Sequence, residues 1–76
     1  MIYDKVVSLL CDQLGVEEDK VSTASDIFED LGADSLDLVD MLMSLEDEFN
    51  IGEVPDEMVE KIHTVGQLVT YIEENI

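Results

Sequence analysis

The sequence predicts an all-α fold, a four-helix bundle with a long first loop and a short third helix, formed by residues 1–76 as one domain. Apolar residues recur every three or four positions in several segments, as on one face of a helix. Gly and Pro fall between these segments, and no segment alternates apolar and polar residues as a half-buried strand would. The chain is 46% hydrophobic, which argues against disorder and for one small core.

The first helix is predicted over residues 2–14. Its apolar residues repeat at spacings of three and four, so they form one face: Ile2, Val6, Leu9, Leu10 and Leu14. Gly15 is a typical residue to end a helix, because glycine readily takes the left-handed conformation. This helix is therefore expected to pack one side against the core.

A long connection follows, over residues 16–34. A loop of this length is unusual in a compact bundle unless it packs or has a function. Apolar residues occur along it and are expected to anchor it in the core: Val16, Val21, Ile27, Phe28 and Leu31. The connection is therefore predicted to be an ordered crossover. Gly32 can take a positive φ near its end, and Asp34 or Ser35 is expected to cap the next helix.

The second helix is predicted over residues 35–50. An apolar stripe along it should face the core: Leu38, Val39, Leu42, Leu45 and Phe49. Acidic residues at 46–48 lie near the C-terminal end, where the helix dipole disfavours negative charge. Selection for stability alone would not place them there, so they hint at a function.

A short third helix is predicted at about 55–61, with Pro55 at its first position and Val59 and Ile62 as core contacts. Thr64 is expected to cap a fourth helix over residues 65–75. Its inward residues are predicted to be Val65, Leu68, Val69 and Ile72.

The charge of the chain limits its partners. Twenty acidic residues against three lysines give a net charge of −17. Nucleic acid and anionic membranes would repel such a surface, whereas basic protein surfaces would be attracted. No apolar run is long enough for membrane insertion, no signal peptide is recognisable, and Cys11 has no cysteine partner. A cytoplasmic protein is therefore expected, although removal of an organellar presequence stays possible.

Catalytic chemistry is not expected. His63 is the only histidine and is predicted to lie at a helix junction, while Ser35 has no evident base to activate it. The carboxylates fall on predicted solvated faces, and no spacing matches a metal-binding loop. Ser35 has another property, because it lies at the expected start of a helix. Free backbone N–H groups and the positive end of the dipole would suit a phosphate attached to its hydroxyl.

Residues 29–37 carry a resemblance to a known family. They are Glu29, Asp30, Leu31, Gly32, Ala33, Asp34, Ser35, Leu36 and Asp37. This stretch resembles the modification motif of acyl carrier proteins of type II fatty acid synthesis. The similarity continues through residues 45–49, 54–57, 60–62, 64–65 and 71–72, and reaches back to 13–16. Residues 50–54 form a segment one residue longer than is usual in the family.

The resemblance implies that residues 1–76 are an acyl carrier domain and that Ser35 carries covalent 4′-phosphopantetheine, which makes the chain a phosphoprotein. A holo-acyl-carrier-protein synthase would transfer this group from coenzyme A, with a divalent metal ion held at the synthase. The thiol of the group would hold a growing acyl chain as a thioester. The carrier would be a monomer and not an enzyme, and would deliver the chain to the enzymes of fatty acid biosynthesis.

The resemblance also implies two further sets of residues. A partner-binding face would meet basic patches on the enzymes of lipid metabolism: Asp34, Leu36, Asp37, Asp40, Met43, Glu46, Asp47, Glu48, Asp56 and Glu60. An internal pocket would shelter the acyl chain: Phe28, Val39, Leu42, Leu45, Ile62 and Leu68. Two alternatives remain open, namely a specialised carrier for polyketide, lipid A or aminoacyl groups, and an unmodified acidic adaptor that binds a basic protein.

Overall fold

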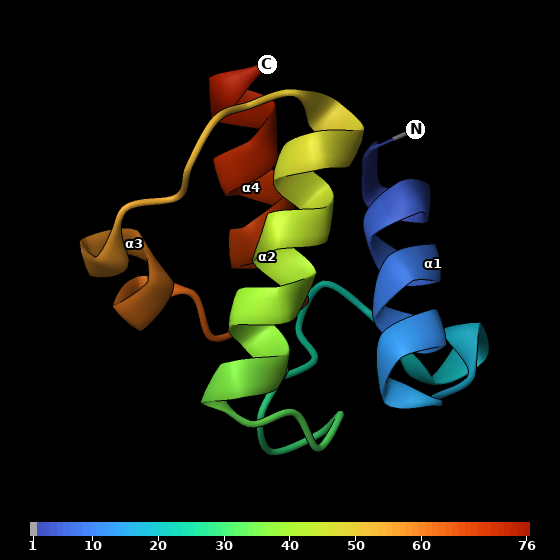
Figure 1. Cartoon of the computed structure of the whole chain (residues 1–76). Helices are drawn as coiled ribbons and strands as arrows, with labels where there is room; N and C mark the ends of the chain where they lie inside the picture. Colours follow the sequence, from blue (N-terminus) through green and yellow to red (C-terminus); the bar gives the residue numbers. More distant parts are fainter. Residues whose placement is uncertain (1) are drawn as a thin grey trace.

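The computed structural model describes residues 2–76 and contains four α-helices. They are α1 (Ile2–Leu14), α2 (Ser35–Phe49), α3 (Asp56–Lys61) and α4 (Val65–Asn75), with a single 3₁₀ turn, η1, at Glu18–Lys20. Helix α1 packs against both α2 and α4, and the short α3 lies to one side of α2 and α4 (Figure 1). No strand forms within residues 2–76, where only an isolated antiparallel bridge joins Asp26 and Thr64. The predicted all-α bundle is confirmed.

Two helix boundaries differ from the prediction by one residue, and a third is as predicted. Helix α2 ends at Phe49, because Asn50 takes the left-handed conformation with φ of 54°. Pro55 immediately precedes α3, since its ψ of 148° is extended. Thr64 caps α4 as predicted, and Gln67 completes a capping box with it.

The core is built from α1, α2 and α4, from the long loop, and from Val54 and Ile62 on either side of α3, which has no buried residue of its own. Its fully buried large side chains are Val6, Leu10, Ile27, Leu38, Met41, Leu45, Ile62, Val65, Leu68 and Ile72. The predicted stripe of α2 is wrong at one position, because Val39 is 41% exposed while Met41 is fully buried. Met41 completes an i, i+3, i+4, i+7 pattern with Leu38, Leu42 and Leu45, and this pattern defines the face that α2 buries.

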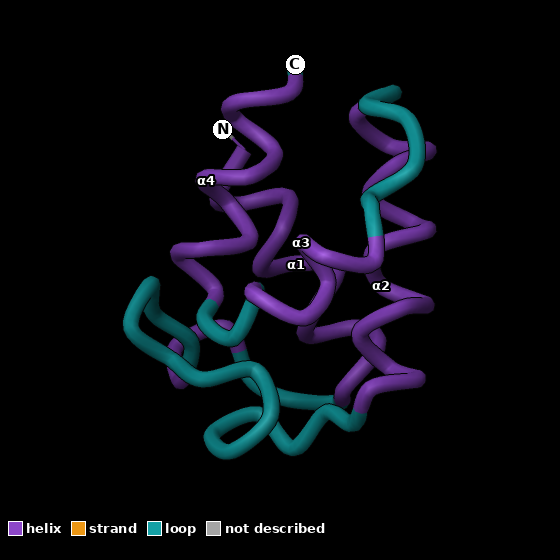
Figure 2. Tube along the Cα trace, turned by 90° about the vertical axis from the view of Figure 1, so that its left-hand side faces the viewer, coloured by secondary structure: helices purple, strands orange, loops and turns teal. Residues whose placement is uncertain are grey.

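The long loop, residues 15–34, is an ordered crossover as predicted. It closes one end of the bundle, opposite the end where α1 begins and α4 ends (Figures 1 and 2). Val21, Ile27 and Leu31 are buried, whereas Val16 and Phe28 are half-buried. The Asp26 carboxylate accepts hydrogen bonds from the N–H groups of Phe28 and Glu29 and thereby fixes a tight turn.

Backbone hydrogen bonds join this loop to the start of α4. The Ile27 N–H donates to the His63 carbonyl at 2.8 Å, and the N–H groups of Val65 and Gly66 donate to the carbonyls of Ser25 and Thr23. The loop therefore has a fixed position relative to the last helix. The same loop leads directly into the first residue of α2.

Gly66 allows the close approach of the loop to α4. A Cβ atom at this position would lie 2.9 Å from the Thr23 carbonyl oxygen. Gly66→Ala is therefore expected to displace the loop and to lower the free energy of unfolding by roughly 1–3 kcal/mol, in spite of the better helix propensity of alanine. Urea unfolding would measure this change.

Thr70→Ala, an exposed change on the same helix, serves as the control and should alter stability by less than about 0.5 kcal/mol. If Gly66→Ala were as stable as the wild type, the contact with Thr23 would have to be readily adjustable.

Candidate functional site

Ser35 is the first residue of α2, and its side chain is exposed. Asp34 caps the helix: its Oδ1 accepts the Asp37 N–H at 2.8 Å, and the Asp37 Oδ2 accepts the Asp34 N–H at 3.3 Å. The preceding residue, Ala33, is buried, and its N–H donates to the Ile27 carbonyl at 3.1 Å. The backbone is thus fixed on both sides of an exposed hydroxyl.

The surroundings of Ser35 favour a bound phosphate group more than a nucleophile. The first turn of a helix has N–H groups without intrahelical partners and the positive end of the helix dipole. Within residues 2–76, no hydrogen bond joins the Ser35 hydroxyl to another side chain, so no base is placed to activate it. The prediction that Asp34 or Ser35 caps the helix is confirmed for Asp34.

The acidic residues predicted to form a partner face differ in their solvent exposure and in whether they bond to other groups of the chain. Asp34, Asp40, Asp47, Asp56 and Glu60 are exposed. The exposed apolar side chains of Leu36 (74%) and Met43 (57%) lie on the same helix, α2. The result is an acidic surface with two apolar contacts on α2, continued by carboxylates of α3.

Four carboxylates of the predicted face have partners within the chain, namely those of Asp34, Asp37, Glu46 and Glu48. Asp37 belongs to the capping box, and Glu46, which is half-buried, accepts the Val54 N–H at 3.0 Å. Glu48 pairs with Lys5 at 3.3 Å, although both side chains are more than half exposed and such a pair contributes little. The acidic end of α2 therefore has structural contacts as well as exposed charge.

A groove lies between α2 and α3. Its volume is about 340 Å³, and it is lined by Val39, Leu42, Met43, Glu46, Glu53, Val54, Asp56 and Val59. Two of the six residues predicted to line an acyl pocket, Val39 and Leu42, contribute to it. Val54 was not predicted; it is an apolar residue directly before Pro55, which is a weak signal in a sequence.

The other predicted pocket residues lie elsewhere. Leu45, Ile62 and Leu68 are at most 1% exposed and belong to the core, although Ile62 also borders a different depression, between α3 and α4. Phe28 is half-buried in the long loop, where its ring contacts the ring of His63 edge-on with 5.9 Å between centroids. The structure thus brings Val39 and Leu42 to an accessible groove but does not bring the whole predicted set there.

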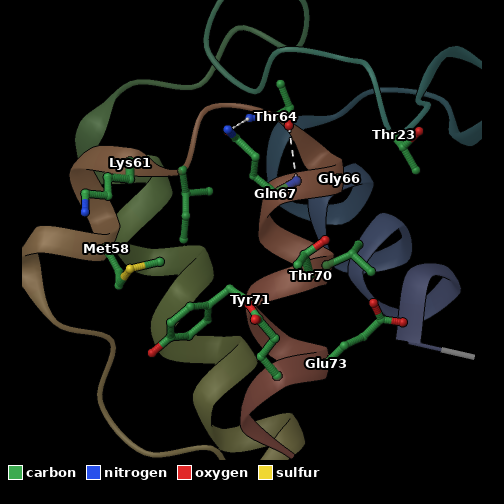
Figure 3. A pocket seen from close by; sticks show the side chains of 12 residues that line it. Thr23, Met58, Lys61, Thr64, Gly66, Gln67, Thr70, Tyr71 and Glu73 are labelled. Carbon is green, nitrogen blue, oxygen red and sulfur yellow. Dashed lines mark hydrogen bonds between the residues drawn. The ribbon is translucent and has the colours of Figure 1, made fainter.

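A larger depression, of about 670 Å³, lies between α3 and α4 (Figure 3). Its lining mixes apolar and polar side chains, including Met58, Lys61, Gln67 and Tyr71, and contains no residue of α2. The side chain of Gln67 at its rim is engaged in the capping box with Thr64 (Figure 3). This depression is open to solvent and separate from Ser35.

Cys11, on α1, is a free and half-buried cysteine. Desolvation, followed by the nearby charges of Glu18 and Asp12, raises the pKa of the Cys11 thiol, which favours its neutral form. Among residues 2–76, no cluster of His, Cys, Asp and Glu side chains is arranged to hold a metal ion. No helix in this range has the length and hydrophobicity to cross a membrane.

Residues 4–72 match the family model described as a phosphopantetheine attachment site. The chain is also similar to the solved structure of the acyl carrier protein from Enterococcus faecalis, a protein described as having high thermal stability. The two are 39% identical, with a TM-score of 0.83, and the alignment covers 99% of this chain and 94% of that one.

Proposed function

Because the chain belongs to the acyl carrier protein family, whose domain is a phosphopantetheine attachment site, we propose that Ser35 is the residue that carries the group. The cofactor of this family is covalent 4′-phosphopantetheine. The observation that supports Ser35 most strongly is its position: an exposed hydroxyl at the first residue of α2, held by the Asp34–Asp37 capping box. This position lies inside the matched range.

The residues around Ser35 fit such a group. No side chain needs to move to admit it, since Ser35 and Leu36 are exposed, and the N–H groups of the first turn face a negative charge favourably. Asp34 and Asp37 hold the turn and keep the hydroxyl at the surface. The group supplies a thiol for thioester chemistry, while the chain supplies attachment, orientation and a recognition surface.

The proposed cargo is a growing fatty acyl chain, handed between the enzymes of type II fatty acid synthesis in the cytoplasm. Two features support this proposal. The apolar side chains of the α2–α3 groove suit an alkyl chain, and the strongly acidic surface suits a carrier that visits many basic partners. A specialised carrier for polyketide, lipid A or aminoacyl groups would share the attachment site. The two hypotheses therefore differ in which acyl group the protein accepts.

The proposed partner surface consists of the exposed acids and the two exposed apolar residues of α2 and α3: Asp34, Leu36, Asp40, Met43, Asp47, Asp56 and Glu60. A holo-acyl-carrier-protein synthase and the synthesis enzymes would present basic patches to it. Each exposed ion pair contributes only about 0–1 kcal/mol, but the combined field accelerates encounter. Fast association with modest affinity suits a monomeric carrier that exchanges partners.

The test is to incubate apo-protein with coenzyme A, Mg²⁺ and a phosphopantetheinyl transferase, and to record its intact mass. We expect a gain of one phosphopantetheine, followed by a second gain when an acyl-acyl-carrier-protein synthetase supplies a fatty acid. Loading of the arm without acceptance of fatty acyl groups would favour a specialised carrier. An apo-protein that gains no arm at all would contradict the proposal and favour the acidic adaptor.

A further inference from the structure

Glu46 holds the segment that joins α2 to α3 at both of its ends. Its backbone carbonyl accepts the N–H of Asn50 and, at 3.3 Å, that of Ile51. Its side-chain Oε2 accepts the N–H of Val54 at 3.0 Å. One residue of α2 therefore fixes where this segment leaves the helix and where it returns beside it.

Residues 51–55 form no regular secondary structure, so helical hydrogen bonds do not hold this segment in place. Two residues with positive φ, Asn50 (54°) and Gly52 (79°), set its direction. The return at Val54 brings a buried side chain (5% exposed) into the lining of the α2–α3 groove, which Val39 and Leu42 also line. In Figure 1 the segment runs from the end of α2 to α3.

We propose that Glu46 is a positioning residue for the α2–α3 groove: its carboxylate, bonded to the Val54 N–H, holds Val54 in the lining of the groove. This inference rests on the proposed function only in assigning the groove to an acyl chain. The role in holding Val54 is independent of what the groove binds.

The electrostatic setting supports a positioning role. A carboxylate near the C-terminal end of a helix is disfavoured by the helix dipole, and Glu53 and Asp56 line the same groove with like charge. The hydrogen bond from a backbone N–H to a carboxylate is charge-assisted and offsets these repulsions. Within the described residues, this is the bond that satisfies the Val54 N–H. A half-buried Glu46 is thus less available to a basic partner than the exposed Asp47 beside it.

Two substitutions separate this role from that of charge. Glu46→Gln removes the charge but keeps a side-chain oxygen that can accept the Val54 N–H, whereas Glu46→Ala removes both. Glu73→Ala, which deletes an exposed carboxylate on α4, is the control for the change in net charge. The first measurement is native-state hydrogen exchange at the Val54 amide of the apo-protein.

We expect Glu46→Ala to accelerate exchange at Val54 by about tenfold, the factor that corresponds to loss of one hydrogen bond of about 1.4 kcal/mol. Glu46→Gln and Glu73→Ala should stay within about threefold of the wild type. The amide of Leu68, inside the core, reports global stability and should change less than that of Val54 in Glu46→Ala. Equal exchange at Val54 in Glu46→Ala and wild type would overturn the proposal, as would an equal acceleration in Glu46→Gln.

The second measurement uses the proteins loaded with octanoyl-phosphopantetheine and follows cleavage of the thioester by hydroxylamine. A groove that opens more often should shelter the chain less, so Glu46→Ala should lose the thioester severalfold faster than Glu46→Gln. Equal cleavage rates in these two variants would contradict the link between Glu46 and the acyl chain. Failure of the wild type to accept the arm would instead contradict the proposed function, and the exchange result at Val54 would still decide the positioning role.

Discussion

Ser35→Ala is expected to abolish the gain of phosphopantetheine completely, with no detectable mass increase after incubation with coenzyme A, Mg²⁺ and a phosphopantetheinyl transferase. The reason is chemical, because alanine has no oxygen to form the phosphodiester. The substitution should leave the fold intact, since Ser35 is exposed and the capping interactions come from Asp34 and Asp37. Far-UV circular dichroism of the variant should therefore match that of the wild type.

Ser44→Ala provides the matched control, because Ser44 is the other serine of α2. It is not at the helix start, so this variant should be modified at the wild-type rate. A mass gain in Ser35→Ala would show that another hydroxyl carries the arm, and the modified residue would then be located by peptide mapping.

Leu68→Ala is expected to produce the largest loss of stability among the substitutions considered. Leu68 is fully buried in the first turn of α4, and truncating it removes apolar contacts and leaves a cavity. Such changes typically lower the free energy of unfolding by about 2–5 kcal/mol. A domain of this size has only several kcal/mol in total, so a large fraction of the variant should be unfolded at 37 °C. Urea unfolding at 25 °C would measure the difference.

Val39→Ala is the comparison, because Val39 was predicted from the sequence to line the same pocket but is 41% exposed. Its truncation should cost less than about 1 kcal/mol. If Leu68→Ala were equally mild, the core around Leu68 would have to collapse easily into the vacated space. That outcome would support the original prediction that Leu68 belongs to an adaptable acyl pocket.

The helices could be predicted well because their signals are local. The start of α2 follows from Asp34 and the start of α4 from Thr64, and both residues act on N–H groups within the next turn. The exchange of Val39 for Met41 in the buried face has a different cause. The stripe on a helix is wider than its contact with any neighbour, and the positions of α1 and α4 decide which flank is covered.

The candidate site could be predicted where it depends on residues that are close together in the sequence. Ser35 at a capped helix start is such a feature. The bond between Glu46 and Val54 and the pair between Lys5 and Glu48 join residues that the chain brings together only after folding. The groove likewise requires Val54 and Val59 to lie against α2, and no periodicity in the sequence indicates this.

The hydrogen bonds between the long loop and the start of α4 have a consequence for biosynthesis. The N–H groups of Ile27, Val65 and Gly66 bond across a large separation in the sequence, from residues 23–27 to 63–66. While the chain emerges from the ribosome, residues 29–37 appear long before residues 63–66, which hold the loop that leads into them. The nascent chain therefore contains the whole of the proposed attachment motif before it can present that motif in its final shape. An enzyme that recognises this shape, and not the bare sequence, would act only on chains in which residues 63–66 have already been synthesised and can fold against the loop.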